Sequence, residues 1–210
     1  MQIDELLALI KERRSIREFT DAKISNEEIN ILIDAARYAP SNNNRQPWKF
    51  IIIKNNQIKS SLAEAVNTKI HLIDETIEDN EVRTLFNDYK DYLLFFAHAP
   101  ILIVALYKAS PFFLNQMCTK ARPKEFDNAI SSELISVSMA IQNLLLAAHS
   151  LGLGACCTTA PLLLASAEMK IILKIAPPFE IAALIPIGRY THPPEAASRK
   201  DIEKIMEFID

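Results

Sequence analysis

Three arginines fall within five positions near the start of the chain, at Arg13, Arg14 and Arg17. Guanidinium groups bind phosphate and carboxylate oxygens through paired hydrogen bonds, and Ser15 adds a hydroxyl among them. If a helix continued through this segment, Arg13 and Arg17 would share one face; in an extended chain, Ser15, Arg17 and Phe19 would share one instead. Either arrangement favours an oxyanion site. The alternative is a solvated helix end whose cations favour the helix dipole.

A second polar stretch, PSNNNRQP at residues 40–47, is dense in amide and hydroxyl groups that both donate and accept hydrogen bonds. Such groups suit the edge of a flat heterocycle with alternating donors and acceptors. Taken in isolation, the same composition is typical of a polar surface turn.

Two further stretches favour anion binding. Residues 152–161, GLGACCTTAP, form a loop that enters a predicted helix, where free backbone N–H groups and the positive end of the dipole are presented. No residue in this loop is suited to act as a general base. Arg199 and Lys200 follow Ser198 at the start of the last predicted helix and again place cations near a possible anion site.

Several other kinds of site are excluded or not indicated. The chain has only three glycines, and neither the dinucleotide fingerprint G-x-G-x-x-G nor the phosphate loop G-x-x-x-x-G-K-[ST] occurs. The four histidines show no metal-ligand spacing, so no metal site is predicted. The three cysteines, two of them adjacent, do not form a disulfide scaffold and favour a reducing cytoplasm; they are Cys118, Cys156 and Cys157.

The bulk composition indicates one globular domain over residues 1–210. Half of the residues are hydrophobic, and the formal net charge of −3 argues against broad electrostatic binding to nucleic acid. The N-terminal residues include acidic side chains and lack a small-residue cleavage site, so no signal peptide is predicted.

Hydrophobic periodicity and turn signals predict the elements that position these residues. A first helix ends near Arg14, and a second has Ser25 as its N-cap in a capping box. Short buried strands are predicted at 48–53, 101–107 and 179–187. Further helices are predicted within 57–96 in two or three pieces, over 129–150, from Pro161 and from about Ser198, whereas 108–127 reads as irregular.

One predicted helix lies in a long stretch without charge. No Asp, Glu, Lys or Arg occurs between Glu133 and Glu168. A membrane span would need about 20 apolar residues, but this stretch carries several serines, amides and a histidine that lipid would disfavour. We therefore expect no membrane segment but a helix buried on nearly all sides, which in a chain of this size needs a partner subunit to cover it.

The order of elements favours an α+β layered domain over a doubly wound fold, because helices outnumber strands and two of them precede the first strand. The four polar stretches, in order and spacing, resemble the FMN-dependent nitroreductase family. The resemblance rests on RRSIREF, APSNNNRQPWKF, NLLLAAHSLGLGACCTTAP and PIGRYTHPPEAASRK. It implies a nitroreductase-like fold with a central mixed sheet flanked by helices, and an intertwined homodimer with FMN at the subunit interface.

The resemblance also implies roles for individual residues. Arg13, Arg14 and Ser15 would hold the phosphate and ribityl end of FMN, and Arg17 would lie near the pyrimidine edge. Thr159 and Ala160 would offer backbone groups near flavin N5 and O4. Arg199 would complete the phosphate clamp, with Lys200 standing in for a lysine that many relatives carry at the position of Ala197. The other subunit would contribute Pro40, Ser41, Asn42, Asn44 and Gln46.

The activity implied is ping-pong oxidoreduction, in which NADH or NADPH reduces FMN and the flavin then reduces a small-molecule acceptor. The acceptor would be a nitroaromatic, a quinone or an enone. Iodotyrosine deiodination and flavin destruction are alternatives on the same scaffold, and a flavin-binding protein without turnover is an alternative from another class.

Overall fold

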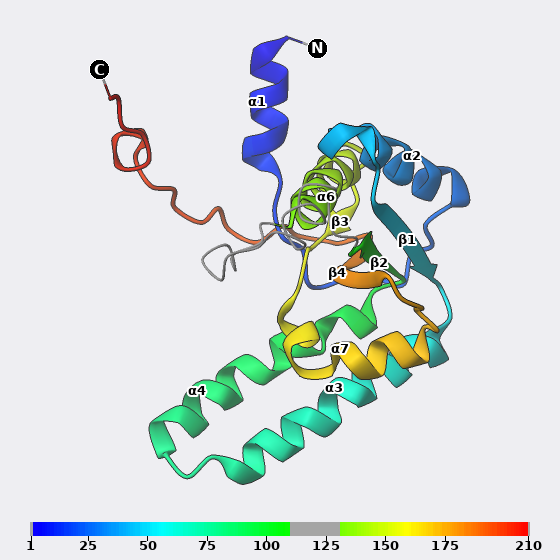
Figure 1. The fold of residues 1–210 in the computed structure, drawn as a ribbon. Helices are drawn as coiled ribbons and strands as arrows, with labels where there is room; N and C mark the ends of the chain where they lie inside the picture. Colours follow the sequence, from blue (N-terminus) through cyan, green and yellow to red (C-terminus); the bar gives the residue numbers. More distant parts are fainter. Residues whose placement is uncertain (1, 110–130, 210) are drawn as a thin grey trace, which may run out of the picture.

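The computed structural model describes residues 2–109 and 131–209, so Cys118 and nearly all of the predicted irregular segment lie outside the described residues. A four-stranded sheet forms the centre, in the order β1-β2-β4-β3 (Figure 1). Its strands are β1 (Trp48–Ile53), β2 (Ile101–Lys108), β3 (Gly154–Ala155) and β4 (Phe179–Gly188). The three predicted strands are confirmed. The two-residue strand β3 was missed because Gly-Ala carries no strand pattern.

The strand directions differ from the mixed sheet that we expected. All three named pairings are antiparallel, and parallel pairing occurs in this part of the chain only as an isolated bridge between Ser15 and Ala155. The physical reason is that long helical segments connect β1 to β2 and β2 to β4. After a connection of that length the next strand can run parallel or antiparallel to the previous one. A buried apolar run alone therefore does not predict the direction of a strand relative to its neighbours.

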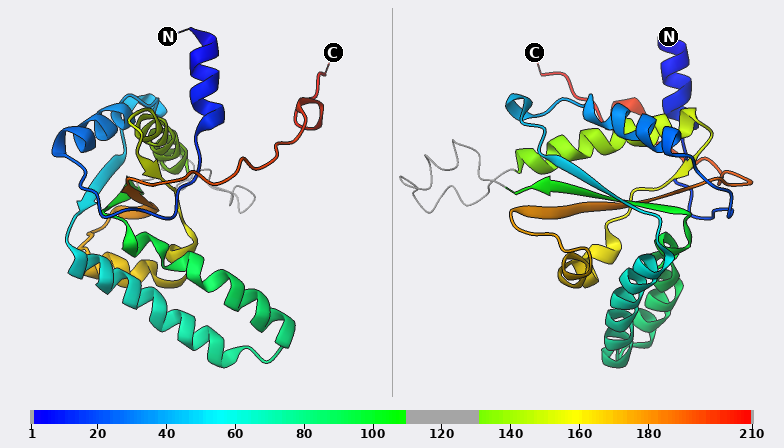
Figure 2. Two further views of the ribbon diagram at one scale, coloured as in Figure 1. Left: turned by 180° about the vertical axis from the view of Figure 1, so that it is seen from behind. Right: turned by 90° about the vertical axis from the view of Figure 1, so that its right-hand side faces the viewer.

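Helices cover both faces of the sheet, which confirms the layered α+β fold (Figure 2). The first face carries α2 (Asn26–Arg37) and α6 (Ser132–Ser150), and the second carries α3 (Asn56–Thr76) and α7 (Ala160–Ile172). The helix α4 (Asn80–Lys90) runs beside α3 and extends with it away from the sheet.

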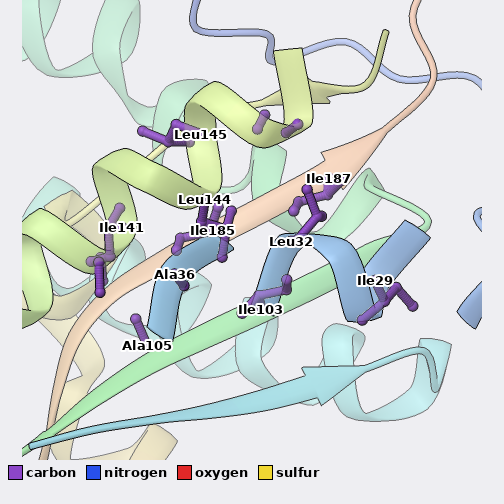
Figure 3. Close-up of a cluster of buried hydrophobic side chains, with 14 of the residues drawn as sticks. Ile29, Leu32, Ala36, Ile103, Ala105, Ile141, Leu144, Leu145, Ile185 and Ile187 are labelled. Atoms are coloured by element: carbon purple, nitrogen blue, oxygen red, sulfur yellow. The ribbon is translucent and has the colours of Figure 1, made fainter. Parts of the chain in front are cut away.

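Successive side chains of β2 point to opposite faces of the sheet, so alternate residues of this strand pack into two separate cores. Ile101, Ile103 and Ala105 pack into the first core, under α2 and α6. Their neighbours Leu102, Val104 and Leu106 pack into the second core, against α3 and α7. Figure 3 shows the first core, in which Leu32 and Leu144 approach the strands from the two covering helices.

Local signals in the sequence explain where several helices begin and end. The Ser25 hydroxyl accepts a hydrogen bond from the Glu28 N–H at 3.1 Å, and the Glu28 carboxylate accepts one from the Ser25 N–H at 2.9 Å. This confirms the predicted capping box. Gly152 has φ +67°, as expected for a residue that ends a helix, and Pro161 lies in the first turn of α7.

The two ends of the chain lie apart from this body. Helix α1 (Ile3–Glu12) has no buried residue and projects from the sheet, as does the C-terminal segment after β4 (Figure 1). The helix predicted from about Ser198 is wrong: the segment has only a single 3-10 turn, at Ile202–Lys204. Helical turns this short are not stable without packing, and every residue from 191 to 209 is exposed. Among the described residues, no helix combines the length and apolar character needed to cross a membrane.

Gly188 packs closely against Phe19, in the segment that follows the arginine cluster. A Cβ at Gly188 would lie 2.7 Å from Phe19 Cδ1 and 2.8 Å from Pro100 Cδ. Gly188→Ala should therefore lower the free energy of unfolding by about 1–3 kcal/mol, as overpacking does. Denaturant unfolding measures this. The control is Gly152→Asn, because a Cβ there meets nothing within 4 Å and asparagine tolerates positive φ. Equal stability of Gly188→Ala and the wild type would contradict the close approach.

Candidate functional site

The arginine cluster adopts the extended arrangement rather than the helical one. Helix α1 ends at Glu12, and Arg13 has ψ 135°, which turns the chain away from helical geometry. The Ile16 N–H then donates to the Ala155 carbonyl at 3.0 Å, in the bridge that joins Ser15 to β3. The cluster is thus held against the loop that precedes α7, so two of the four predicted stretches meet in the structure.

Arg17 and the α7 loop share a cavity of about 460 Å³. Its other lining residues come from the end of α4 and the turns that follow it. The full set is Arg17, Tyr89, Tyr92, Phe95, Cys156, Cys157, Thr158, Thr159 and Ala160. This volume lies within the range of small-molecule sites. The predicted site residues Arg17, Thr159 and Ala160 are therefore brought together within one chain.

Aromatic side chains surround the Arg17 guanidinium. Its Cζ lies 5.7 Å from the ring centroid of Tyr92 and 5.9 Å from that of Phe95. Tyr89 and Tyr92 stack with their centroids 5.8 Å apart. Within the described part of the chain Arg17 forms no ion pair, which argues against its pairing with Glu18 or Asp21 at the surface. These aromatic residues were not predicted from the sequence, although Tyr89 and Tyr92 are three apart and so share a helical face.

Arg13 and Arg14 line a separate cavity of about 320 Å³ on the other side of the same segment. His149, at the end of α6, and Tyr190, after β4, also contribute to it. A third cavity, of about 280 Å³, is lined by Ser15 and Arg17 among others. The three cavities follow one segment of extended chain, with paired arginines at one end and an aromatic pocket at the other.

The predicted loop at 40–46 has a strained backbone. Asn43, Asn44 and Gln46 have φ of 51°, 52° and 46°, in the left-handed region that non-glycine residues rarely adopt. The Ser41 hydroxyl holds the turn by accepting from the Gln46 N–H at 3.0 Å. Strained conformations of this kind concentrate at functional sites, so the strain supports a binding role over an ordinary surface turn.

This loop lies far from the arginine cluster of the same chain. Asn42 contacts Ser132 and Arg45 pairs with Glu133, both in the first turn of α6. The arginine cavity instead includes His149, in the last turn of the same helix. At 1.5 Å per residue the two ends of α6 are separated by roughly 24 Å. One chain therefore does not bring these two predicted parts of the site together.

Arg199 and Lys200 also lie away from the other arginines. Both are exposed on the C-terminal segment, and the Arg199 guanidinium donates only to the nearby carbonyls of Ala197 and Ser198 among the described residues. To take part in the predicted phosphate clamp, both residues would have to be carried by this segment to the FMN phosphate.

The two adjacent cysteines are both thiols. Cys156 is buried and Cys157 is exposed at the aromatic cavity. Burial raises the pKa of the Cys156 thiol, and partial desolvation at the cavity wall raises the pKa of Cys157, so neither is set up as a reactive thiolate. The described residues also include no group of three or more acidic, histidine or cysteine side chains arranged for a metal ion.

Two relatives extend these observations. A provisionally named NADH dehydrogenase/NAD(P)H nitroreductase of Methanothermobacter thermautotrophicus is 30% identical over 155 residues, which are 72% of this chain. The chain spans only 59% of the length of that relative. The iodotyrosine deiodinase of Thermotoga neapolitana is 25% identical over 94% of this chain and 95% of its own length.

Solved structures share the fold. A BluB-like flavoprotein from Clostridium difficile matches with a TM-score of 0.85 and 24% identity, over the full length of both chains. A nitroreductase with bound FMN from Desulfitobacterium hafniense matches with a TM-score of 0.68 and 23% identity, again over both full lengths. The sequence profile of the nitroreductase family matches residues 10–189. These matches, together with the strained loop, the arginine cluster and the layered fold, show that the chain belongs to the nitroreductase family.

Proposed function

We propose that this chain is an FMN-dependent oxidoreductase that uses NADH or NADPH to reduce a small conjugated acceptor, such as a nitroaromatic, a quinone or an enone. The observation that carries the proposal is the cavity in which Arg17 meets Thr159 and Ala160, beside aromatic side chains. The provisional name of the archaeal relative and the FMN-bound structural neighbour support the same assignment.

The residues present fit FMN at both of its ends. A phosphate is bound well by guanidinium groups, which donate paired hydrogen bonds, and Arg13 and Arg14 supply these on one side of the segment. A flat ring system needs apolar and aromatic surface, which Tyr92 and Phe95 supply on the other side. Ser15 lies between these two ends, where a hydroxyl can hydrogen-bond to the ribityl chain.

When bound, FMN supplies the transfer of two electrons, and the chain's own residues bind and orient it. No residue of the aromatic cavity is an Asp, Glu or His, in accord with chemistry that needs no general base from the protein. Arg17 would place a fixed positive charge beside the flavin ring. The first turn of α7 would direct the N–H groups of Thr159 and Ala160 toward the ring edge.

The proposal includes a homodimer with each FMN site at the interface. Apolar residues that a partner would cover are exposed on three elements: Ile3 on α1 (65% exposed), Ile135 on α6 (51%) and Phe208 in the C-terminal segment (80%). The separation of loop 40–46 from the arginine cluster by the length of α6 supports a loop supplied by the partner. Arg199 and Lys200 lie on the exposed segment after β4, which projects from the sheet (Figure 1), and in the proposed dimer this segment crosses to the partner subunit.

The absorbance spectrum of the purified protein tests the cofactor, and anaerobic titration tests the activity. We expect a flavin spectrum that bleaches on addition of NADH or NADPH and recovers when a nitroaromatic or a quinone is added. A spectrum that only dithionite bleaches would identify a flavin-binding protein without turnover. Absence of flavin after incubation with FMN and desalting would contradict the proposal as a whole.

A dehalogenase is the second candidate function. The deiodinase relative, whose match spans nearly all of both chains, favours it, and the aromatic cavity would also suit an iodinated phenol. Release of iodide from 3-iodotyrosine under reducing conditions, compared with turnover of a nitroaromatic by the same preparation, separates the two functions.

Arg17 should set the reduction potential of bound FMN. A fixed cation at the pyrimidine edge stabilises the negative charge that reduction places there. Arg17→Gln keeps the hydrogen-bonding capacity and removes the charge, so the potential should fall by some tens of millivolts, about 30 mV corresponding to about 1.4 kcal/mol. Potentiometric titration of variant and wild type measures this. Lys90→Gln is the control, because Lys90 lies between Tyr89 and Tyr92 in the sequence but does not line the cavity. An unchanged potential and unchanged FMN affinity would make Arg17 an ordinary surface residue.

A further inference from the structure

A further cavity, larger than the three around the arginine cluster, lies on another part of the molecule. It has a volume of about 670 Å³ and is bounded by residues 21–24, by the start of α3 and by the turn that precedes β2. None of its lining residues belongs to the three cavities around the arginine cluster. The cavity is therefore separate from the proposed FMN site.

A buried lysine forms part of the wall of this cavity. The Lys59 side chain extends from the first turns of α3, and the residue is only 3% exposed. Its ammonium donates to the backbone carbonyls of Ala99 and, at 3.4 Å, Pro100, both of which also line the cavity. No carboxylate of the described residues pairs with it. Burial without a counter-ion lowers the pKa of Lys59, and such a cation is costly to maintain.

The other charges around the cavity are mainly positive. Lys23 and Lys54 line it together with Lys59, against one carboxylate, that of Asp21. Three lysines and one aspartate leave two net positive charges from these four side chains. Lys54 donates to the amide oxygen of Asn26 at 2.5 Å, so its charge is also not neutralised by that contact.

Neutral hydrogen-bond donors and a helix dipole also favour an anion in this cavity. Helix α3 has 21 residues and begins at the cavity, where its positive end faces an anion. The Ser60 hydroxyl and the Asn56 amide also line the space and can donate hydrogen bonds. The cavity therefore combines a buried cation, two exposed cations and several neutral donors.

We propose that this cavity is a second anion site, which binds a phosphate group as a dianion, either as inorganic phosphate or as the monoester of a small metabolite. A phosphate carries a charge of about −1.5 to −2 at pH 7, which matches the two net positive charges of the wall. Its oxygens accept charge-assisted hydrogen bonds from ammonium groups. Binding would supply the counter-ion that Lys59 lacks among the described residues.

Calorimetry on the FMN-saturated protein in phosphate-free buffer tests the proposal. Saturation with FMN occupies the phosphate site that we assign to the arginine cluster, so a new binding event reports on the lysine cavity. We expect one equivalent of inorganic phosphate or of adenosine monophosphate per chain. Tighter binding of the ester identifies a phosphorylated metabolite as the ligand, and equal binding identifies the phosphate group alone. No saturable binding of either ligand overturns the proposal.

Variants of the lysines assign the binding to this cavity. Lys23→Gln and Lys54→Gln should each weaken phosphate binding about tenfold or more, as the loss of a charge-assisted contact does. Lys59→Met keeps the buried stem and should abolish binding, while FMN affinity stays unchanged. Lys49→Gln, on β1 but outside the cavity, is the matched control. Phosphate binding that survives Lys23→Gln and Lys54→Gln unchanged would also overturn the proposal, whether or not the protein binds FMN.

Discussion

Replacing Arg199 with alanine should weaken FMN binding roughly 10- to 150-fold and leave riboflavin binding almost unchanged. The expected loss is about 1.5–3 kcal/mol, the contribution of one hydrogen bond to a charged group. Riboflavin lacks the phosphate, so it cannot gain or lose this contact. Fluorescence titration of the apoprotein with each flavin measures both affinities under the same conditions.

The C-terminal segment offers a matched control for this experiment. Lys204 is also an exposed cation of the segment, but it pairs with Asp201 at 3.0 Å and has no role in the proposed clamp. Lys204→Ala should leave both flavin affinities unchanged. An equal loss for FMN and riboflavin in Arg199→Ala would remove Arg199 from the phosphate site and indicate a general effect on the fold.

Mixing two defective variants should restore FMN binding if each site is shared between two subunits. In the first variant, Arg13→Ala and Arg14→Ala remove the phosphate side of the site. In the second, Asn44→Gly and Gln46→Gly remove the amides of the partner loop, while glycine accepts the positive φ that both residues have. We expect each variant alone to bind FMN poorly, because each site of its homodimer lacks one half.

A heterodimer of these variants, purified through two different tags, should contain one intact site and one site with both defects. The expected result is about one FMN per heterodimer, at a concentration that saturates the wild type. A heterodimer that binds no FMN would mean that the site forms within one chain. If sedimentation at nanomolar concentration finds a folded, FMN-loaded monomer, the proposed homodimer is wrong.

The sequence predicted best those features that depend on local physics. The buried strand at 101–107 and the capping box at Ser25 each follow from a few neighbouring residues, and each is confirmed. The strand directions were not predictable in this way, because they depend on the path of long connections. The C-terminal helix was predicted wrongly because a helix near Ser198 depends on packing, and residues 191–209 are exposed and unpacked in the part of the chain that the structure describes.

The candidate site also contains some residues that could be predicted from local sequence motifs and others that could not. The family resemblance carried by RRSIREF and GLGACCTTAP implied roles for Arg17, Thr159 and Ala160, and the structure brings these three residues together in one cavity. The stacked residues Tyr89 and Tyr92 were missed, because aromatic residues on an amphipathic helix are read as core. The predicted roles of Pro40, Gln46 and Arg199 depend on a second copy of the chain, and they remain predictions.

The order of the strands also has a consequence for how the chain folds. Strand β2 pairs on one side with β1, as Ile53 does with Leu102, and on the other with β4, as Ile101 does with Ile187. Both pairings join residues far apart in the sequence, and such high contact order slows folding. During synthesis β2 leaves the ribosome long before β4, so its continuous apolar run has an unpaired edge while α6 and α7 are still being made. We expect the newly made chain to be most prone to aggregation in this interval, and least prone once β4 closes the centre of the sheet.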